Sequence, residues 1–218
     1  NMDWILLNKI HQDWISILMF SNLMLLSLIK WRYNRKFTSF FKSIDPSVYF
    51  NNYGNNFFFN RYFGASILVF SIVNISLCLI FVLNSFNLIE LDVISFLIFF
   101  SFLLLIGFFS YLINSILGGI LAVKRETLVY SFINLRFLFR ISIFIFIILV
   151  IHYYYFFDTF IFLNTTSFCV FVFYFLYSII IIYKFLRNLE KGKLYFILYL
   201  CTLKITPWVF IYWVIKNI

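Results

Sequence analysis

Two long and predominantly apolar runs, residues 63–83 and 137–157, restrict this chain to a small set of folds. Neither run alternates polar and apolar residues, as a strand of a membrane barrel would. Each is long enough for a helix that crosses the roughly 30 Å hydrocarbon core of a bilayer, which takes about 20 residues. Of all residues, 64% are hydrophobic and 11% are charged, whereas soluble domains carry about 25% charged residues. The pattern predicts an all-α, polytopic membrane protein.

Six segments approach the length of a membrane-crossing helix, and together they make one transmembrane domain over residues 1–218. The predicted spans are residues 14–29, 62–83, 93–117, 137–157, 167–183 and 194–215. The first is short, but Lys30 at its end is able to extend its amine towards the headgroups. Trp14 and Trp31 flank this span, as expected of aromatic residues at the two membrane interfaces.

Basic residues gather in three clusters that alternate with pairs of predicted spans, and this pattern orients the chain. The clusters are Lys30, Arg32, Arg35, Lys36, Lys42 and Arg61; Lys124, Arg125, Arg136 and Arg140; and Lys184, Arg187, Lys191 and Lys193. Short loops rich in Lys and Arg stay in the cytoplasm. We therefore predict about six crossings, with the three clusters in the cytoplasm and both termini on the non-cytoplasmic side.

The same clusters indicate a partner for the cytoplasmic face. The chain carries a net charge of +9, but the charges lie between hydrophobic spans and form no basic domain for nucleic acid. Anionic headgroups of membrane lipid are the simpler partner. The residues expected to contact headgroups are Arg32, Arg35, Lys36, Lys124, Arg125, Arg136, Arg140, Lys184 and Arg187.

Two cytoplasmic segments are longer than simple turns. Residues 37–60 mix many Phe and Tyr with several Asn, which is too aromatic for water and too polar for the membrane core. We predict an interfacial loop at headgroup level, and a protein-binding loop is the alternative. Residues 126–139 place Leu128, Phe132 and Phe139 at helical spacing, which predicts an interfacial helix that leads into the fourth span.

Residues 195–207, near the C-terminal end, have the sequence YFILYLCTLKITP. This segment resembles the C-terminal signature of DUF4271, an uncharacterised integral membrane family of Bacteroidetes, in which a Tyr-Leu-Cys run precedes an acidic residue and then Pro. Residues 112–138 are also similar, since Glu126, Tyr130 and Asn134 follow a Gly-containing helix end. The chain departs from the family pattern at Lys204, where Glu is expected. The resemblance covers roughly a third of the chain, and it implies a helical inner-membrane protein with no known activity or catalytic residue.

Lys204 is the side chain with the strongest indication of a specific role. It lies near the middle of the sixth predicted span, where a charge costs about 2.5–3.5 kcal/mol. No Asp or Glu lies within any predicted span. Pro207 leaves the carbonyl of Leu203 without its helical donor, which makes a local polar site beside the Lys. Lys204 and Pro207 are therefore candidate functional or partner-binding residues; the alternative is that the last helix is displaced and Lys204 extends to an interface.

Three asparagines, Asn22, Asn74 and Asn114, lie inside separate predicted spans. Side chains of this kind commonly form hydrogen bonds between membrane helices, so helix association is the default interpretation. The functional alternative is that the three line a polar pathway through the membrane. That alternative requires them to lie at comparable depth.

The sequence shows no constellation of residues for catalysis, for metal binding or for a cofactor. His11 and His152 make no metal-binding pair, and the three cysteines lie within apolar stretches without the spacing of metal ligands. No phosphate-binding Gly-rich loop and no nucleophile motif is present. An enzyme is therefore the less favoured class.

Three functions remain as hypotheses. The favoured one is a non-enzymatic subunit or scaffold of a larger envelope complex in the bacterial inner membrane, which binds other membrane proteins and anionic lipid. The alternative is a small transporter or channel with Lys204 in a polar pathway. The third is a membrane enzyme that handles lipid phosphates, for which Asp45, Glu126 and Glu190 are the acidic residues on the cytoplasmic side.

Overall fold

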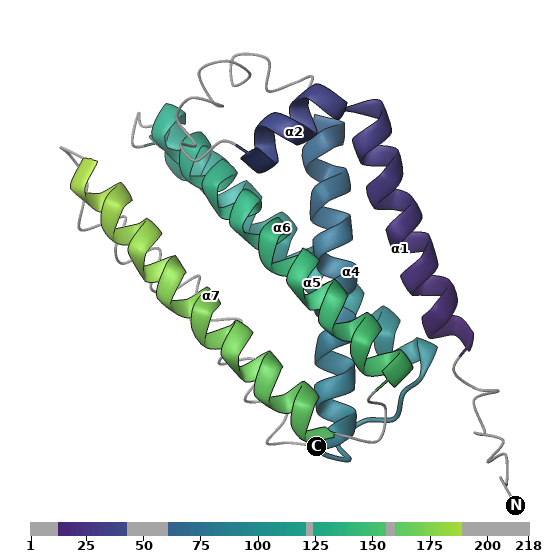
Figure 1. Cartoon of the computed structure of the whole chain (residues 1–218). Helices are drawn as coiled ribbons and strands as arrows, with labels where there is room; N and C mark the ends of the chain where they lie inside the picture. The colour runs from purple at the N-terminus through teal and green to yellow at the C-terminus, as the bar shows by residue number, and fades with distance from the viewer. Residues whose placement is uncertain (1–12, 43–60, 121–123, 156–159, 189–218) are drawn as a thin grey trace, which may run out of the picture.

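The computed structural model describes residues 13–42, 61–120, 124–155 and 160–188 (Figure 1). These ranges are helical apart from the junction at Tyr33 and the turn at residues 86–92. The helices are α1 (Asp13–Arg32), α2 (Asn34–Lys42), α4 (Arg61–Ser85), α5 (Val93–Ile120), α6 (Lys124–Tyr155) and α7 (Phe160–Asn188). The predicted all-α fold is confirmed for the described residues.

Four described helices contain stretches that are long and apolar enough to cross a membrane. The stretches are Asp13–Arg32, Tyr62–Ser85, Val93–Leu112 and Ser131–Tyr155. They overlap the first four predicted spans, and they indicate an integral membrane protein. A shorter apolar stretch in α7, Asn164–Ile180, overlaps the fifth predicted span. The sixth, residues 194–215, lies outside the described residues, so the total of six crossings stays a prediction.

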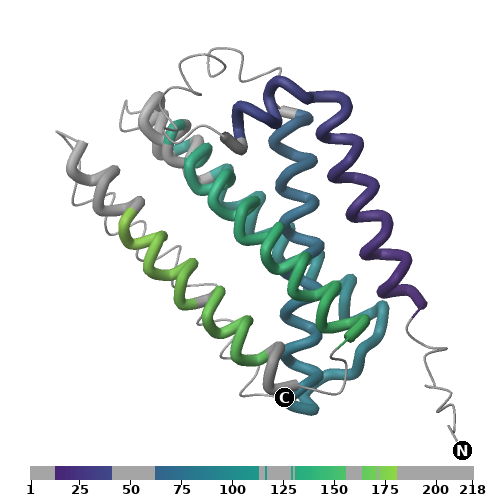
Figure 2. The backbone as a smooth tube through the Cα atoms, viewed as in Figure 1, coloured from purple at the N-terminus to yellow at the C-terminus, as the bar shows by residue number. Residues whose placement is uncertain are grey.

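α4 lies in the middle of the bundle and packs against α1, α5, α6 and α7 (Figure 1). The C-terminal end of α1 lies at the same end of the bundle as the N-terminal end of α4 (Figure 2). The C-terminal end of α7 and the N-terminal end of α6 lie at this end too (Figure 1). This end is termed the basic end, because Lys30 and Arg32 lie in the last turn of α1 and Lys124 begins α6. The opposite end is termed the acidic end, because it carries Asp13 at the start of α1 and Glu90 in the turn after α4.

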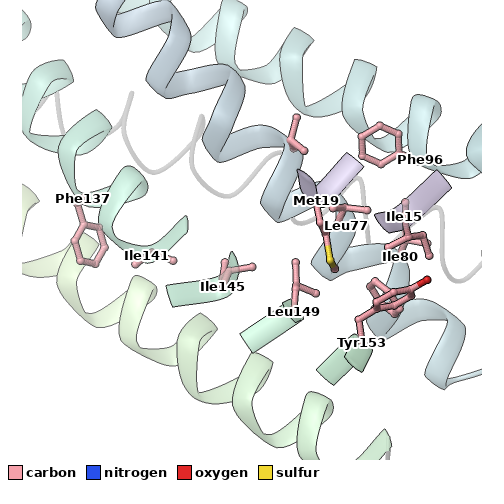
Figure 3. Close-up of a cluster of buried hydrophobic side chains, with 12 residues drawn as sticks. Ile15, Met19, Leu77, Ile80, Phe96, Phe137, Ile141, Ile145, Leu149 and Tyr153 are labelled. Atoms are coloured by element: carbon pink, nitrogen blue, oxygen red, sulfur yellow. The ribbon is translucent and has the colours of Figure 1, made fainter. Parts of the chain in front are cut away.

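Two groups of buried apolar side chains form the core. The large cluster lies mostly towards the acidic end, where Ile15 and Met19 of α1 lie beside Leu77 and Ile80 of α4 (Figure 3). The aromatic cluster lies towards the basic end, and its buried members are Ile29, Phe40, Phe63, Ile67, Phe70 and Phe139. Because α1, α4 and α6 contribute to both clusters, these three helices make the continuous centre of the bundle.

α2 turns across the basic end and closes the aromatic cluster (Figure 1). Phe40 is only 1% exposed. Its ring lies edge-on to the rings of Phe63, Phe132 and Phe139, at centroid distances of 5.6, 5.4 and 5.9 Å. Part of the predicted interfacial loop, residues 37–42, therefore belongs to a helix that packs on the bundle, while residues 43–60 lie outside the described residues.

α6 is one continuous helix from Lys124 to Tyr155. The segments predicted separately as an interfacial helix, residues 126–139, and as the fourth span thus form a single element as far as Tyr155. No Gly or Pro interrupts this part of the sequence, so nothing in the backbone separates the two segments.

The side chain of Phe137 is buried, and its ring stacks on Tyr177 of α7 with the centroids 3.6 Å apart.

The turn between α4 and α5 ends α4 in a Schellman motif. The N–H of Leu88 donates to the carbonyl of Leu83 at 3.1 Å, and the N–H of Asn87 donates to the carbonyl of Asn84 at 2.8 Å. Asn87 has a φ of 56°, in the left-handed region that Asn tolerates better than most residues. This short connection holds α4 and α5 antiparallel.

Candidate functional site

Asn22, Asn74 and Ser142 meet in the interior of the bundle, where they are 3%, 0% and 0% exposed. They come from α1, α4 and α6 respectively. Along α1, Asn22 lies between Met19 of the large cluster and Ile29 of the aromatic cluster. Along α4, Asn74 lies between Phe70 of the aromatic cluster and Leu77 of the large cluster, and along α6, Ser142 lies one turn after Phe139 of the aromatic cluster. The three residues therefore form one layer across the core, termed the polar layer.

Hydrogen bonds connect the polar layer across all three helices. Nδ2 of Asn22 donates to Oδ1 of Asn74 at 2.8 Å. Nδ2 of Asn74 donates to Oγ of Ser142 at 3.0 Å and to the carbonyl of Phe70, one turn earlier in α4, at 3.0 Å. Asn74 is therefore the central member, bonded to a neighbour on each side.

The carbonyl of Phe70 determines which way the Asn74 amide points. A carbonyl only accepts, so the nitrogen of the amide must face Phe70 and Ser142, and Oδ1 must face Asn22. Asn22 then has to present its nitrogen to Asn74, which leaves its own Oδ1 on the far side. That oxygen is buried and accepts no hydrogen bond from the described residues. The orientation of the whole layer follows from one backbone group.

The polar layer lies near the middle of the membrane-crossing stretches. Asn22 is central in Asp13–Arg32, Asn74 is central in Tyr62–Ser85, and Ser142 is central in Ser131–Tyr155. Polar groups at this depth have no water to bond with, so they bond to one another. Such interhelical hydrogen bonds contribute about 0.6–2 kcal/mol each to helix association.

Sequence reasoning singled out two of the three members and missed Ser142. The fourth span was predicted to begin at residue 137, which places residue 142 near one end, whereas the apolar stretch in α6 begins at Ser131. A correct start for that span would have shown Ser142 at the same depth as Asn22 and Asn74. Asn114 lies in α5, but its side chain is outside the described part of the structure, as are Lys204 and Pro207.

A family model, "Domain of unknown function (DUF4271)", matches residues 15–215, which is nearly the whole chain. The chain belongs to the DUF4271 family. The predicted resemblance is therefore confirmed, and the match extends over the segment of residues 195–207 on which it was based. No curated protein and no solved structure matches this DUF4271 chain.

Further polar contacts join the helices of the DUF4271 bundle towards the acidic end. Oγ of Ser16 in α1 donates to the Tyr153 hydroxyl in α6 at 3.3 Å. Oγ of Ser85, at the end of α4, donates to Oδ1 of Asn164 in α7 at 2.9 Å. These contacts lie away from the polar layer; the first joins α1 to α6, and the second joins α7 to α4.

The basic residues of the DUF4271 chain have different surroundings. Arg32 and Arg35 are exposed at the basic end. Lys36 is half-buried, with its Nζ 5.9 Å from the centroid of the Tyr33 ring. Arg140 is half-buried as well. The side chains of Lys124, Arg125, Lys184 and Arg187 lie outside the described part of the structure.

Arg136 was predicted to contact lipid headgroups, and in the structure its side chain is only 4% exposed. It shares a face of α6 with Phe132 and Phe139, which pack against Phe40 of α2. The arginine side chain therefore lies inside the bundle.

The polar layer has limited chemistry. It contains two amides and a hydroxyl, none of which titrates at ordinary pH or binds a metal strongly. Among the described residues, no three His, Cys, Asp or Glu side chains gather as a metal site requires. His152 of α6 is buried, with its ring edge-on to Phe81 at a centroid distance of 5.7 Å. What this arrangement does is hold α1, α4 and α6 in one register.

Proposed function

We propose that this DUF4271 protein is a non-enzymatic subunit or scaffold of a larger envelope complex in a bacterial inner membrane. In this role it binds other membrane proteins and anionic lipid. The observation that carries the proposal is the polar layer, whose members hydrogen-bond to one another across three helices. The layer holds no ionisable group that would move a proton or bind a charged substrate. Its polar groups stabilise the association of helices.

The outward faces of α5 and α7 support an embedded role. Large apolar side chains such as Ile94, Leu105 and Phe108 of α5 and Phe173 and Leu176 of α7 are exposed. A soluble monomer rarely exposes so much apolar surface. In a membrane, lipid tails and the helices of partner proteins cover these faces without cost.

For orientation, we place the basic end in the cytoplasm and both termini on the opposite side of the membrane. The grouping of Lys30, Arg32 and the start of α6 at one end of the bundle supports this choice, since basic residues are retained in the cytoplasm. Asp13 and Glu90 then lie outside.

Lys204 is the proposed contact with a protein partner. In the sixth predicted span its charge has no carboxylate at the same depth in this chain, so a carboxylate on a partner helix would neutralise it. Pro207 supports the same site, because it frees a helix carbonyl beside the Lys.

Affinity purification from gently solubilised native membranes tests both parts of the proposal. We expect the tagged protein to retain defined membrane partners in fixed proportion. Lys204→Met is expected to reduce their recovery at least tenfold, because an unpaired buried charge on the partner costs about 3–5 kcal/mol. Lys216→Met removes a charge outside the predicted spans, so it serves as the matched control and is expected to leave recovery unchanged.

The possible results separate the two parts. A monodisperse wild-type protein without partners would contradict the scaffold function. If Lys204→Met retained the partners as well as the wild-type protein does, only the proposed role of Lys204 would be contradicted.

A transporter or channel with Lys204 in a polar pathway is the alternative function, and it requires the polar layer to line that pathway. Asn22 and Asn74 would have to face water, whereas they bond to each other at 2.8 Å in the core. The pathway function therefore requires a second arrangement in which the polar layer opens.

A further inference from the structure

The junction of α1 and α2 makes a rigid, cationic corner on the basic end. α1 ends at Arg32 and α2 begins at Asn34, with Tyr33 between them. Helical hydrogen bonds continue across the junction, from the N–H of Tyr33 to the carbonyl of Ile29 at 3.0 Å and from the N–H of Phe37 to the carbonyl of Tyr33 at 2.8 Å. The corner is therefore held by backbone bonds on both sides, although the chain changes direction there (Figure 1).

The packing of α2 determines which of its residues face outward. The rings of Tyr33 and Phe37 lie against Phe63 and Phe139, at centroid distances of 5.5 and 6.0 Å. The opposite face of α2 carries Arg35, which is exposed. The aromatic anchors thus fix the direction of the Arg35 side chain, away from the core.

Lys30, Arg32 and Arg35 are all exposed, and they lie within six consecutive positions. At a helical rise of about 1.5 Å per residue, their backbones lie within roughly 10 Å of one another. Trp31, between the first two, is 82% exposed, although an indole ring prefers the membrane interface to water. Three cations and an interfacial ring therefore share one corner.

Among the acidic side chains that the structure describes, none lies at the basic end; the side chain of Glu126, at the start of α6, is outside that set. Asp13, Glu90 and Asp92 all lie towards the acidic end. The other described cations near the corner are less available, because Arg136 is buried and Lys36 lies over the Tyr33 ring.

We propose that the corner of Lys30, Trp31, Arg32 and Arg35 is a binding site for an anionic phospholipid of the leaflet at the basic end. The cations hold the headgroup phosphate, and the Trp31 ring lies beside the glycerol region. This inference rests on the proposed binding of anionic lipid. Of the basic residues predicted to contact headgroups, Arg32 and Arg35 belong to this site, and the structure adds Lys30 to them.

The test compares lipid retention by the full-length protein in nanodiscs of equal phosphatidylglycerol and phosphatidylcholine. After extraction into mild detergent, native mass spectrometry measures the ratio of the two lipids that stay bound. Each basic residue near an anionic surface contributes about fivefold to binding, so Lys30→Gln/Arg32→Gln/Arg35→Gln is expected to lower the ratio at least tenfold. The charge-matched comparison is Lys124→Gln/Arg125→Gln/Lys184→Gln, which removes three charges from two other helices at the same end. Because these charges are not gathered at one corner, this variant should lower the ratio several-fold less than the corner variant does.

The possible results distinguish a local lipid site from a phosphate site and from a diffuse attraction. A lipid site is supported if the ratio of bound phosphatidylglycerol to phosphatidylcholine falls several-fold more in the corner variant than in the comparison variant and if millimolar inorganic phosphate leaves the wild-type ratio unchanged. Competition by inorganic phosphate would overturn the lipid as the ligand. Equal loss in both variants would overturn the local site and leave a diffuse attraction of the basic end. A wild-type protein without preference for phosphatidylglycerol would overturn both the site and the proposed lipid binding, and it would leave the test of protein partners unaffected.

Discussion

Asn74→Leu is expected to destabilise the folded protein by about 2–4 kcal/mol. Asn74 bonds to Asn22 on α1 and to Ser142 on α6, so its loss leaves polar groups on two other helices buried without their partner. Each such group costs about 1–3 kcal/mol, and no water is available to replace the bond at this depth. Unfolding of the purified protein in mixed micelles, followed by circular dichroism during titration with dodecyl sulfate, measures the loss.

Ser76→Ala is the matched control for Asn74→Leu. Ser76 lies on the same helix and is equally buried, but its Oγ donates to the carbonyl of Ile72 in its own helix at 2.8 Å. Its removal strands no group on another helix, so we expect a loss below about 1 kcal/mol. A loss for Asn74→Leu no larger than that for Ser76→Ala would show that the polar layer does not hold the helices together.

Phe40→Ala is expected to cost about 3 kcal/mol and to release α2 from the basic end. The ring is buried among Phe63, Phe132 and Phe139, and Phe→Ala substitutions in cores typically cost about 3–5 kcal/mol. We expect the lower end of this range, because lipid and detergent tails cover part of the apolar surface that the release of α2 would expose. Hydrogen exchange of α2 amides should rise, while exchange within the middle of α4 should change little.

Thr38→Ala separates the loss of packing from a general weakening of α2. Thr38 is exposed, and its hydroxyl bonds to the carbonyl of Asn34 in the same helix at 2.8 Å. We expect a change within about 0.5 kcal/mol, as is usual for surface positions. If Phe40→Ala and Thr38→Ala had equal effects on α2 exchange, α2 would not be anchored by its aromatic face.

The apolar runs and the basic clusters carried most of the information about the fold. A run of about 20 apolar residues has few alternatives to a membrane helix, which is why the first four predicted spans coincide with described helices. Basic residues near span ends indicated in addition which helix ends lie together. Asn22 and Asn74 were also recognisable, because a polar amide in an apolar span needs a partner.

Tertiary packing explains what the sequence did not reveal. Arg136 and Phe40 were predicted to lie at the membrane interface, and the structure shows that both side chains are buried. The burial of Phe40 depends on ring contacts with residues far away in the chain, such as Phe132. Ser142 was missed because composition placed the start of the fourth span at residue 137, whereas the apolar stretch of α6 begins at Ser131.

Water access to Ser142 tests most directly whether the polar layer is a closed contact between helices. Ser142→Cys is a small change within the layer, introduced after Cys78, Cys169 and Cys201 are replaced by Ala. Thr38→Cys, exposed on α2, provides the accessible reference. Both are treated in native membranes with a small, charged methanethiosulfonate reagent that reacts from water.

A closed layer predicts rapid labelling of Thr38→Cys and no labelling of Ser142→Cys until the protein is unfolded in dodecyl sulfate. Labelling of Ser142→Cys in native membranes at a rate within tenfold of Thr38→Cys would contradict the closed layer, and it would favour a polar pathway through the bundle.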